Sequence, residues 1–206
     1  MNLQTLEQLM KNRQPSIIGA RRSYAVLVPL VEIEGTLHLL YEVRSESMRR
    51  QPGEVCFPGG KLEPGETPLA GALRETEEEL GISPDRVTLL GPLDYMHHQG
   101  VFVMHPFLGV ISQETYCSIV CNEAEVKETF LTPLDFLKRH PPFVYEYQMI
   151  PHIGDDFPYE KIRFTEGYSF APGIGEIPIY EYQNHIIWGI TGRITRSVMQ
   201  LMGVKQ

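Results

Sequence analysis

One segment, from Gly60 to Ile82, constrains the fold of this chain more than any other; it reads GKLEPGETPLAGALRETEEELGI. A glycine-rich turn leads there into a short helix, for which Thr67 is a suitable N-cap and Pro68 a suitable first residue. Gly81 is placed to end the helix in the left-handed conformation that glycine adopts without strain. The segment therefore predicts a helix with clear signals at both ends.

The predicted helix has two distinct faces. At about 100° per residue, one mostly apolar stripe should pack on a core. Its members are Leu69, Ala72, Leu73, Thr76 and Leu80. Glu75, Glu78 and Glu79 fall together on an adjacent flank with Gly71, whose missing side chain lets another group approach the backbone. We expect this acidic flank to be open.

Three glutamates near the C-terminal end of a helix are unfavourable, because the helix dipole is negative there and the carboxylates repel one another. A divalent cation would remove the conflict, since Mg²⁺ and Mn²⁺ prefer oxygen ligands. The alternative is a solvated acidic face on which Arg74 pairs with Glu78 one turn away. The run of glutamates alone leaves both interpretations open.

The spacing of the whole segment resembles the Nudix box of nucleoside-diphosphate-linked hydrolases. The matching positions are Gly60, Glu66, Arg74, Glu75, Glu78, Glu79, Gly81 and Ile82. Thr76 departs from the family, which usually has an aliphatic residue there, but its place in the core-facing stripe makes this a matter of packing. The resemblance implies an α/β fold, a Nudix-type α/β/α sandwich with a mixed β-sheet, and metal-dependent hydrolysis of a phosphate anhydride.

The resemblance also implies roles for individual residues. Glu75, Glu78 and Glu79, with the carbonyl of Gly59, would hold Mg²⁺ or Mn²⁺ against the diphosphate. Arg74 would fix a box glutamate by ion pairing, and Glu66 would brace the turn before the helix rather than touch substrate.

A general base is expected from Glu78 or from a second acidic segment. Residues 122–126, Asn-Glu-Ala-Glu-Val, resemble the acidic segment that follows the box in coenzyme A hydrolases. Glu123, Glu125 and Glu128 compete for this role, and we favour Glu125; a solvated loop is the alternative.

The chain upstream of the box resembles the coenzyme A pyrophosphatase branch of the same superfamily. The resemblance rests on Arg44-Ser45, Arg49, Gly53 and the tetrad Phe57-Pro58-Gly59-Gly60. The branch usually has Leu-Leu-Thr before its first arginine, whereas this chain has Leu40-Tyr41-Glu42. Residues 186–195, IIWGITGRIT, also resemble the end of that branch.

This branch implies cleavage of coenzyme A or an acyl-CoA into 4′-phosphopantetheine and adenosine 3′,5′-bisphosphate. Arg44, Arg49 and Gly60 form the expected substrate-binding set, because guanidinium groups bind phosphate oxygens in pairs. Arginines that only cover apolar neighbours are the alternative. The competing functions are hydrolysis of ADP-ribose, nucleotide sugars or dinucleotide polyphosphates, and nucleotide binding without hydrolysis.

Composition narrows the remaining possibilities. The 206 residues, 42% of them hydrophobic, predict one domain over 1–206, with an N-terminal helical extension at 1–20 and a core at about 22–202. No apolar run approaches about 18 residues and the N-terminus lacks a signal peptide's apolar region, so we expect a soluble, cytoplasmic protein without membrane contacts. The net charge of −8 disfavours nucleic acid. The family resemblance implies a small-molecule substrate as the partner. A homodimer is compatible with the sequence.

The remaining predictions concern secondary structure and side chains outside the box. Apolar periodicity predicts a helix at Leu3–Met10, a hairpin of strands at Tyr24–Val31 and Leu37–Val43, and further strands at Val87–Leu93 and Val101–Ile111. We expect a loop at Met96–Gly100, which contains His97 and His98, and a final helix capped by Asn184. The aromatic residues of the loop at 152–175 either pack together or line a ligand pocket. The cysteines Cys56, Cys117 and Cys121 are expected to be ordinary thiols.

Overall fold

The computed structural model describes residues 2–11, 13, 17–98, 102–164 and 167–204. The helices are α1 (Leu3–Met10), α2 (Pro68–Leu80), α3 (Gln113–Cys117), α4 (Leu134–Arg139) and α5 (Gly189–Leu201), with 3₁₀ turns η1 (Pro84–Arg86) and η2 (Tyr159–Ile162). The strands of the large sheet are β1 (Arg22–Ile33), β2 (Thr36–Arg44), β3 (Val55–Cys56), β4 (Gly59–Lys61), β5 (Thr88–Pro92), β6 (Met96–His98), β7 (Phe102–Ile111) and β8 (Val126–Pro133). A small sheet contains β9 (Phe143–Met149), β10 (Gly173–Tyr182) and β11 (His185–Ile187).

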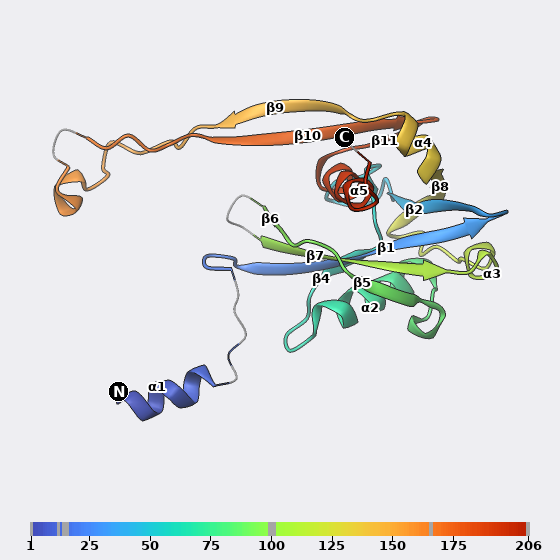
Figure 1. Ribbon diagram of the computed structural model, residues 1–206, viewed down its shortest axis with the longest axis horizontal. Helices are drawn as coiled ribbons and strands as arrows, with labels where there is room; N and C mark the ends of the chain where they lie inside the picture. Colours follow the sequence, from blue (N-terminus) through green and yellow to red (C-terminus); the bar gives the residue numbers. More distant parts are fainter. Residues whose placement is uncertain (1, 12, 14–16, 99–101, 165–166, 205–206) are drawn as a thin grey trace.

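The large sheet is mixed and lies between helices. Its order is β3-β2-β1-β7-β5, and β4, β6 and β8 pair with β1, β7 and β2. β1 runs parallel to β7, whereas the other pairs are antiparallel. Figure 1 shows α2 on one side of this sheet and α5 on the other, beneath the β9–β10 hairpin. This arrangement confirms the predicted α/β/α sandwich.

Helix α2 forms as its end signals predict. The Thr67 side chain accepts a hydrogen bond from the amide of Ala70 at 3.3 Å, and Gly81 ends the helix with φ 69°. Ala72, Thr76 and Leu80 of the predicted stripe are fully buried. The Thr76 hydroxyl donates to the carbonyl of Ala72 at 2.7 Å, so a polar side chain occupies the family's aliphatic position without an unpaired group.

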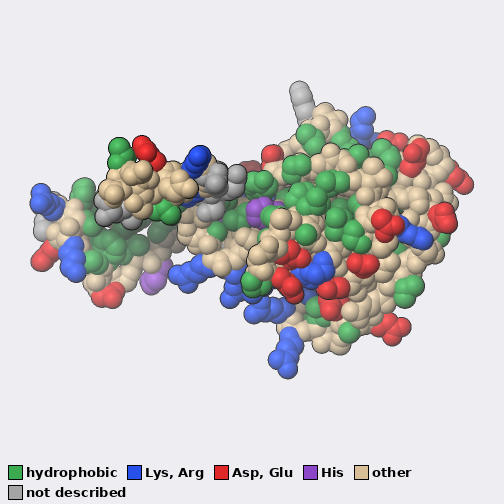
Figure 2. Space-filling model, turned by 90° about the horizontal axis from the view of Figure 1, so that it is seen from below, with side chains coloured by type: hydrophobic (Ala, Val, Ile, Leu, Met, Phe, Trp, Pro, Cys, Tyr) green, Lys and Arg blue, Asp and Glu red, His purple; other side chains and the backbone are tan. Residues whose placement is uncertain are grey.

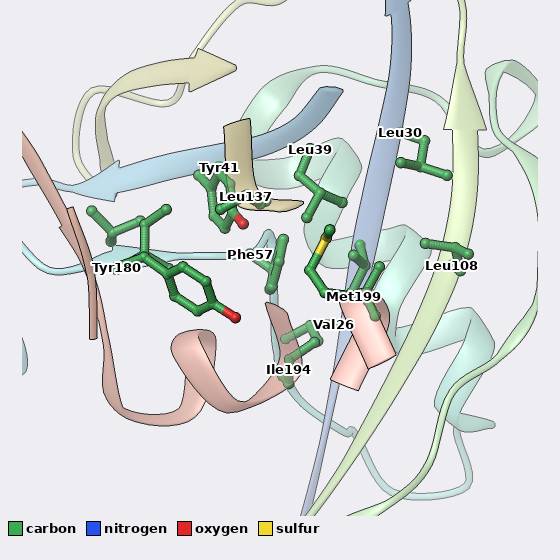
Figure 3. Close-up of a cluster of buried hydrophobic side chains, with 14 of the residues drawn as sticks. Val26, Leu30, Leu39, Tyr41, Phe57, Leu108, Leu137, Tyr180, Ile194 and Met199 are labelled. Atoms are coloured by element: carbon green, nitrogen blue, oxygen red, sulfur yellow. The ribbon is translucent and has the colours of Figure 1, made fainter. Parts of the chain in front are cut away.

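The main core lies between the large sheet and α5. Figure 3 shows apolar side chains from β1, β2, β7, α4 and α5 meeting there around Tyr41. The Tyr41 ring stacks between Phe57 and Phe130, with centroid distances of 4.8 and 5.3 Å. Its hydroxyl shares a 2.9 Å hydrogen bond with Thr195 of α5, which fixes the helix to β2.

The end of the chain differs from the prediction. Asn184 does not cap a helix; it lies in the turn between β10 and β11, and Ile186 and Ile187 belong to β11. The turn residue Gln183 has φ 52°, and His185–Ile187 then pair with Tyr180–Tyr182. The backbone leaves the strand at Gly189, where φ is 62°, and only there does the helix begin.

Two other predictions can be compared with the structure. Met96–His98 form strand β6 rather than a loop, because they pair with Phe102–Met104 of β7; residues 99–101 lie outside the described residues. The long loop lies at the far end of the β9–β10 hairpin (Figure 1), and its aromatic residues pack on one another. Their ring contacts join Phe157 with Tyr159 and Phe170, and Tyr168 with Phe164 and Phe170.

The predicted helix at Leu3–Met10 is present, with its apolar side chains exposed and away from the sandwich (Figure 1). Across the part of the chain that the structure describes, every helix is too short or too polar to cross a bilayer.

Candidate active site

A cavity of about 840 Å³ lies between the large sheet, α5 and the β9–β10 hairpin. This volume is in the range of small-molecule sites. Strands β1, β4 and β7, the loop between β2 and β3, the start of α5, helix α2 and the acidic loop before β8 all contribute to its walls. Side chains of opposite charge line it: Glu54, Glu75, Glu79, Glu125 and Glu176, and Arg22, Arg44, Arg50 and Arg193.

Two glycines of β4 bring the carboxylates of α2 to this cavity. The backbone amide of Gly59 donates to Glu79 Oε2 at 2.8 Å. A side chain at Gly60 would place its Cβ 2.4 Å from the Glu75 carboxyl carbon, so only glycine lets Glu75 pack there. A Cβ at Gly59, which has φ 147°, would lie 2.3 Å from the carbonyl oxygen of Ala25. The Pro-Gly-Gly motif therefore serves close packing of β4 against both β1 and α2.

Arg74, in the middle of α2, contacts carboxylates both along this helix and in the turn before it. Its guanidinium group lies 2.9 Å from oxygens of Glu66, Glu75 and Glu78. Glu66 also accepts from the amide of Glu63 at 3.0 Å, which confirms that Glu66 braces the turn before the helix. These hydrogen bonds, chiefly that from Arg74, hold the pKa of Glu66 below its usual value.

The three box glutamates lie in different environments. Glu79 is only 3% exposed, which corrects the expectation of a uniformly open acidic flank. The side chain of Glu75 is 18% exposed and reaches the cavity, and burial raises its pKa although Arg74 opposes this. The side chain of Glu78 is 56% exposed, pairs with Arg74 and does not line the cavity.

Glu42 is a buried carboxylate that the sequence interpretation missed. It is 1% exposed on β2, one oxygen accepts from the Cys56 thiol at 3.1 Å, and the other has no hydrogen-bond partner among the described residues. Burial raises the pKa of Glu42 to about 7. Burial, and then the charge of Glu42, raises the pKa of Glu79 to about 9. The available signal was one acidic residue within the apolar strand sequence LLYEV.

The acidic loop before β8 is tied to the end of α2. The amide of Asn122 donates to the carbonyl of Glu79 at 2.9 Å, and the amide of Ser45 donates to the carbonyl of Glu125 at 2.7 Å. Glu125 consequently lines the cavity beside Glu75 and Glu79, whereas Glu123 and Glu128 do not.

Of the two arginines predicted to bind substrate, one lines the cavity and the other does not. Arg44 lines the cavity, and its Nε atom is buried without a hydrogen-bond partner among the described residues. Arg49 is exposed and does not line the cavity, while its neighbour Arg50 does. Gly60, the third member of the predicted substrate-binding set, lies in the cavity wall. Two further arginines line the cavity: Arg22 of β1, which lies in no motif, and Arg193 of α5, which lies in the segment 186–195 but had been given no role.

The donor atoms suit a hard divalent cation, because Glu75, Glu79 and Glu125 offer carboxylate oxygens on one wall. Glu79 is buried beside other carboxylates and its pKa is raised, as expected for a carboxylate without a cationic partner. Within the described residues, no three acidic, His or Cys side chains already form a coordination shell, and Glu75 is paired with Arg74. Cation binding would therefore require Glu75 to exchange this ion pair for the metal.

The fold is a mixed α/β sandwich with a large cavity lined by carboxylates and guanidinium groups, an arrangement that suits a small-molecule enzyme. Residues 21–151 match the family model described as the NUDIX domain, and the chain belongs to this family. A Caenorhabditis elegans relative named Nudix hydrolase 3 is 37% identical over 97% of this chain and 82% of that protein.

Two further relatives carry more specific names. The Mus musculus protein named peroxisomal coenzyme A diphosphatase NUDT7 is 40% identical. The alignment covers 87% of this chain and 72% of the mouse protein. The Homo sapiens protein named mitochondrial coenzyme A diphosphatase NUDT8 is 32% identical. The alignment covers 87% of this chain and 69% of the human protein.

The fold comparison agrees with this family. The crystal structure of a MutT/nudix family protein from Enterococcus faecalis aligns with a TM-score of 0.53 at 14% identity. The alignment covers 98% of this chain and 70% of that chain, and it supports the fold alone.

Proposed function

We propose that this protein hydrolyses the pyrophosphate bond of coenzyme A or an acyl-CoA, releasing 4′-phosphopantetheine and adenosine 3′,5′-bisphosphate. The observation that carries the proposal is the meeting of Glu75, Glu79 and Glu125 with Arg44 in one cavity. Two relatives named coenzyme A diphosphatases support the choice of substrate.

In this proposal Glu75, Glu79 and the carbonyl of Gly59 hold Mg²⁺ or Mn²⁺, with Glu78 as a further ligand once it leaves Arg74. The bound cation supplies charge neutralisation at the diphosphate and lowers the pKa of water. Arg44 binds phosphate oxygens with its free Nε donor, and Arg49 is an outer contact because its side chain is exposed.

We assign proton acceptance from the attacking water to Glu125, because Glu125 lines the cavity. Glu78 is the alternative acceptor. Arg74 acts as a positioning residue, since it lies 2.9 Å from both Glu75 and Glu78 and would orient these carboxylates toward a bound cation.

The decisive assay incubates the purified protein with coenzyme A and identifies both products by mass spectrometry. We expect turnover with Mg²⁺ or Mn²⁺ and none with excess EDTA. A panel containing ADP-ribose, a nucleotide sugar and a dinucleotide polyphosphate tests the substrate. Turnover of ADP-ribose well above that of coenzyme A would contradict the assignment.

The base is tested by replacing single glutamates with glutamine. Glu125→Gln should lower kcat about 10²- to 10⁴-fold, the usual contribution of a general base. The matched control is Glu77→Gln, an exposed residue of α2 outside the cavity. Full activity of Glu125→Gln together with a large loss in Glu78→Gln would transfer the role to Glu78.

A cytoplasmic location and a homodimeric state belong to the same proposal. The relatives named as peroxisomal and mitochondrial make these organelles the alternatives. Cell fractionation tests the location, and light scattering of the purified protein tests the oligomeric state.

A further inference from the structure

Arg22 and Arg193 lie on opposite walls of the cavity and have no ion-pair partner among the described residues. Other arginines nearby are already neutralised: Arg196 pairs with Glu176, and Arg74 contacts three carboxylates. Figure 2 shows Lys and Arg side chains gathered beside a group of acidic ones near the middle of the molecule. Arg44 and Arg50 line the same cavity and also have no ion-pair partner among the described residues. In a chain with a net charge of −8, four guanidinium groups in one cavity suit an anionic ligand.

Arg22 is separated from the carboxylates along β1. Val26 pairs with Gly59, which binds Glu79, and Ala25 pairs with Gly60, which packs against Glu75. Arg22 precedes Val26 by four residues, or about 13 Å of extended strand. A negative group near Arg22 would therefore escape the repulsion of the carboxylates.

Arg193 belongs to the same end of the cavity. It also lines an adjoining cleft of about 230 Å³, together with Met96 and His97 of β6. These residues pair with Met104 and Val103 of β7, while the neighbouring Phe102 pairs with Arg22. Arg22 on β1 and Arg193 on α5 are thus both placed at the end of the cavity next to β6.

The aromatic surface at this end suits the nucleotide half of a substrate. Tyr24 and Phe102 form an edge-to-face pair with ring centroids 5.0 Å apart, and both line the cavity. Aromatic rings next to two guanidinium groups are a common means of binding a base and its phosphates.

We propose that Arg22 and Arg193 bind the phosphomonoester on the ribose of the nucleotide half, so that the cavity selects a 3′-phosphorylated substrate. This inference rests on the proposed function, since coenzyme A carries a 3′-phosphate that dephospho-coenzyme A and ADP-ribose lack. The diphosphate then occupies the carboxylate end and the 3′-phosphate the arginine end. The two guanidinium groups act on specificity and not on the bond that breaks.

The kinetic test compares kcat/KM for coenzyme A and 3′-dephospho-coenzyme A. The variants are Arg22→Gln, Arg193→Gln and the double variant, with Arg86→Gln as the control. Arg86 is exposed on η1 and lies outside the cavity. Each single variant should lose about tenfold on coenzyme A, as expected for a charge-assisted hydrogen bond, and should stay near wild type on the dephospho substrate. The double variant should treat both substrates alike. Equal losses on both substrates, or a preference unchanged in the double variant, would overturn the inference.

A binding measurement separates this inference from the proposed reaction. Calorimetry compares adenosine 3′,5′-bisphosphate with AMP, neither of which contains the bond to be cleaved. We expect tighter binding of the bisphosphate in wild type and loss of that difference in the double variant. This result without turnover of coenzyme A would support the phosphate site and refute the catalytic proposal. Turnover of coenzyme A together with equal affinities for both nucleotides would support the catalytic proposal and refute the phosphate site.

Discussion

Replacing Glu42 with glutamine should make the stability of the metal-free protein less dependent on pH. Glu42 and Glu79 are both buried, at 1% and 3% exposure, and their pKa values rise from 4.5 to about 7 and about 9. The folded protein thus keeps protons that the unfolded chain releases. The corresponding stability is fully present below about pH 4.5 and is lost as the pH rises through 7 for Glu42 and 9 for Glu79.

The magnitude follows from the size of the shift. For Glu42, a rise from 4.5 to about 7 corresponds to about 3 kcal/mol of unfolding free energy lost across this interval. Glutamine keeps an oxygen that can accept from the Cys56 thiol but does not ionise. It also removes the charge that helps to raise the pKa of Glu79. The loss of stability on raising the pH should therefore shrink by about 3 kcal/mol or more in the variant.

The assay is denaturant unfolding in EDTA at several pH values between about 5 and 9. The slope against pH is the relevant quantity, because the buried amide of glutamine changes the absolute stability by a separate amount. Glu77→Gln serves as the control, since Glu77 is exposed on α2. If Glu42→Gln retained the full wild-type slope, Glu42 would be ionised in the folded protein at neutral pH and the electrostatic argument would be refuted.

Two further predictions test the packing around the site. Gly60→Ala should lower kcat/KM on the proposed substrate at least about tenfold, because the alanine Cβ would displace the Glu75 carboxylate. The melting temperature should change little. An unchanged kcat/KM would contradict this prediction. Tyr41→Phe removes a buried 2.9 Å hydrogen bond to Thr195 and should lower the unfolding free energy by about 1 kcal/mol with KM unchanged. Denaturant unfolding and steady-state kinetics measure both effects, and a Tyr41→Phe protein as stable as wild type would show that the bond is not net stabilising.

The sequence predicted the elements whose signals are local. Helix α2 has its N-cap at Thr67 and its left-handed end at Gly81, as the capping rules require. The end of the chain was misjudged because Ile186 and Ile187 fit the apolar stripe of a helix equally well. Their strand is fixed by pairing with Tyr180 and Glu181 in β10, a contact that helical periodicity does not reveal.

The site likewise combines residues that a local motif indicates with residues that only the tertiary fold brings together. Family spacing indicated Glu75 and Glu79, and the acidic segment indicated Glu125, all of which line the cavity. Glu42 was missed because its burial depends on tertiary packing, which brings Cys56 of β3 into hydrogen-bonding contact and Glu79 of α2 close to it. Arg22 was missed because it lies in no motif, and Arg193 because the resemblance of residues 186–195 assigned no role to it. The parallel pairing of β1 with β7 and the position of α5 bring both to one cavity.

Taken together, the two proposals predict an orientation for the substrate. Glu42 and Glu79 cost the metal-free protein stability at neutral pH, since burial opposes their ionisation. A cation bound at this end would offset that cost and attract the diphosphate, whereas the arginines at the other end would bind phosphate without a metal. A substrate with one internal diphosphate and one terminal phosphate would then bind in a single direction, with its anhydride beside Glu75 and Glu79 and its terminal phosphate between Arg22 and Arg193.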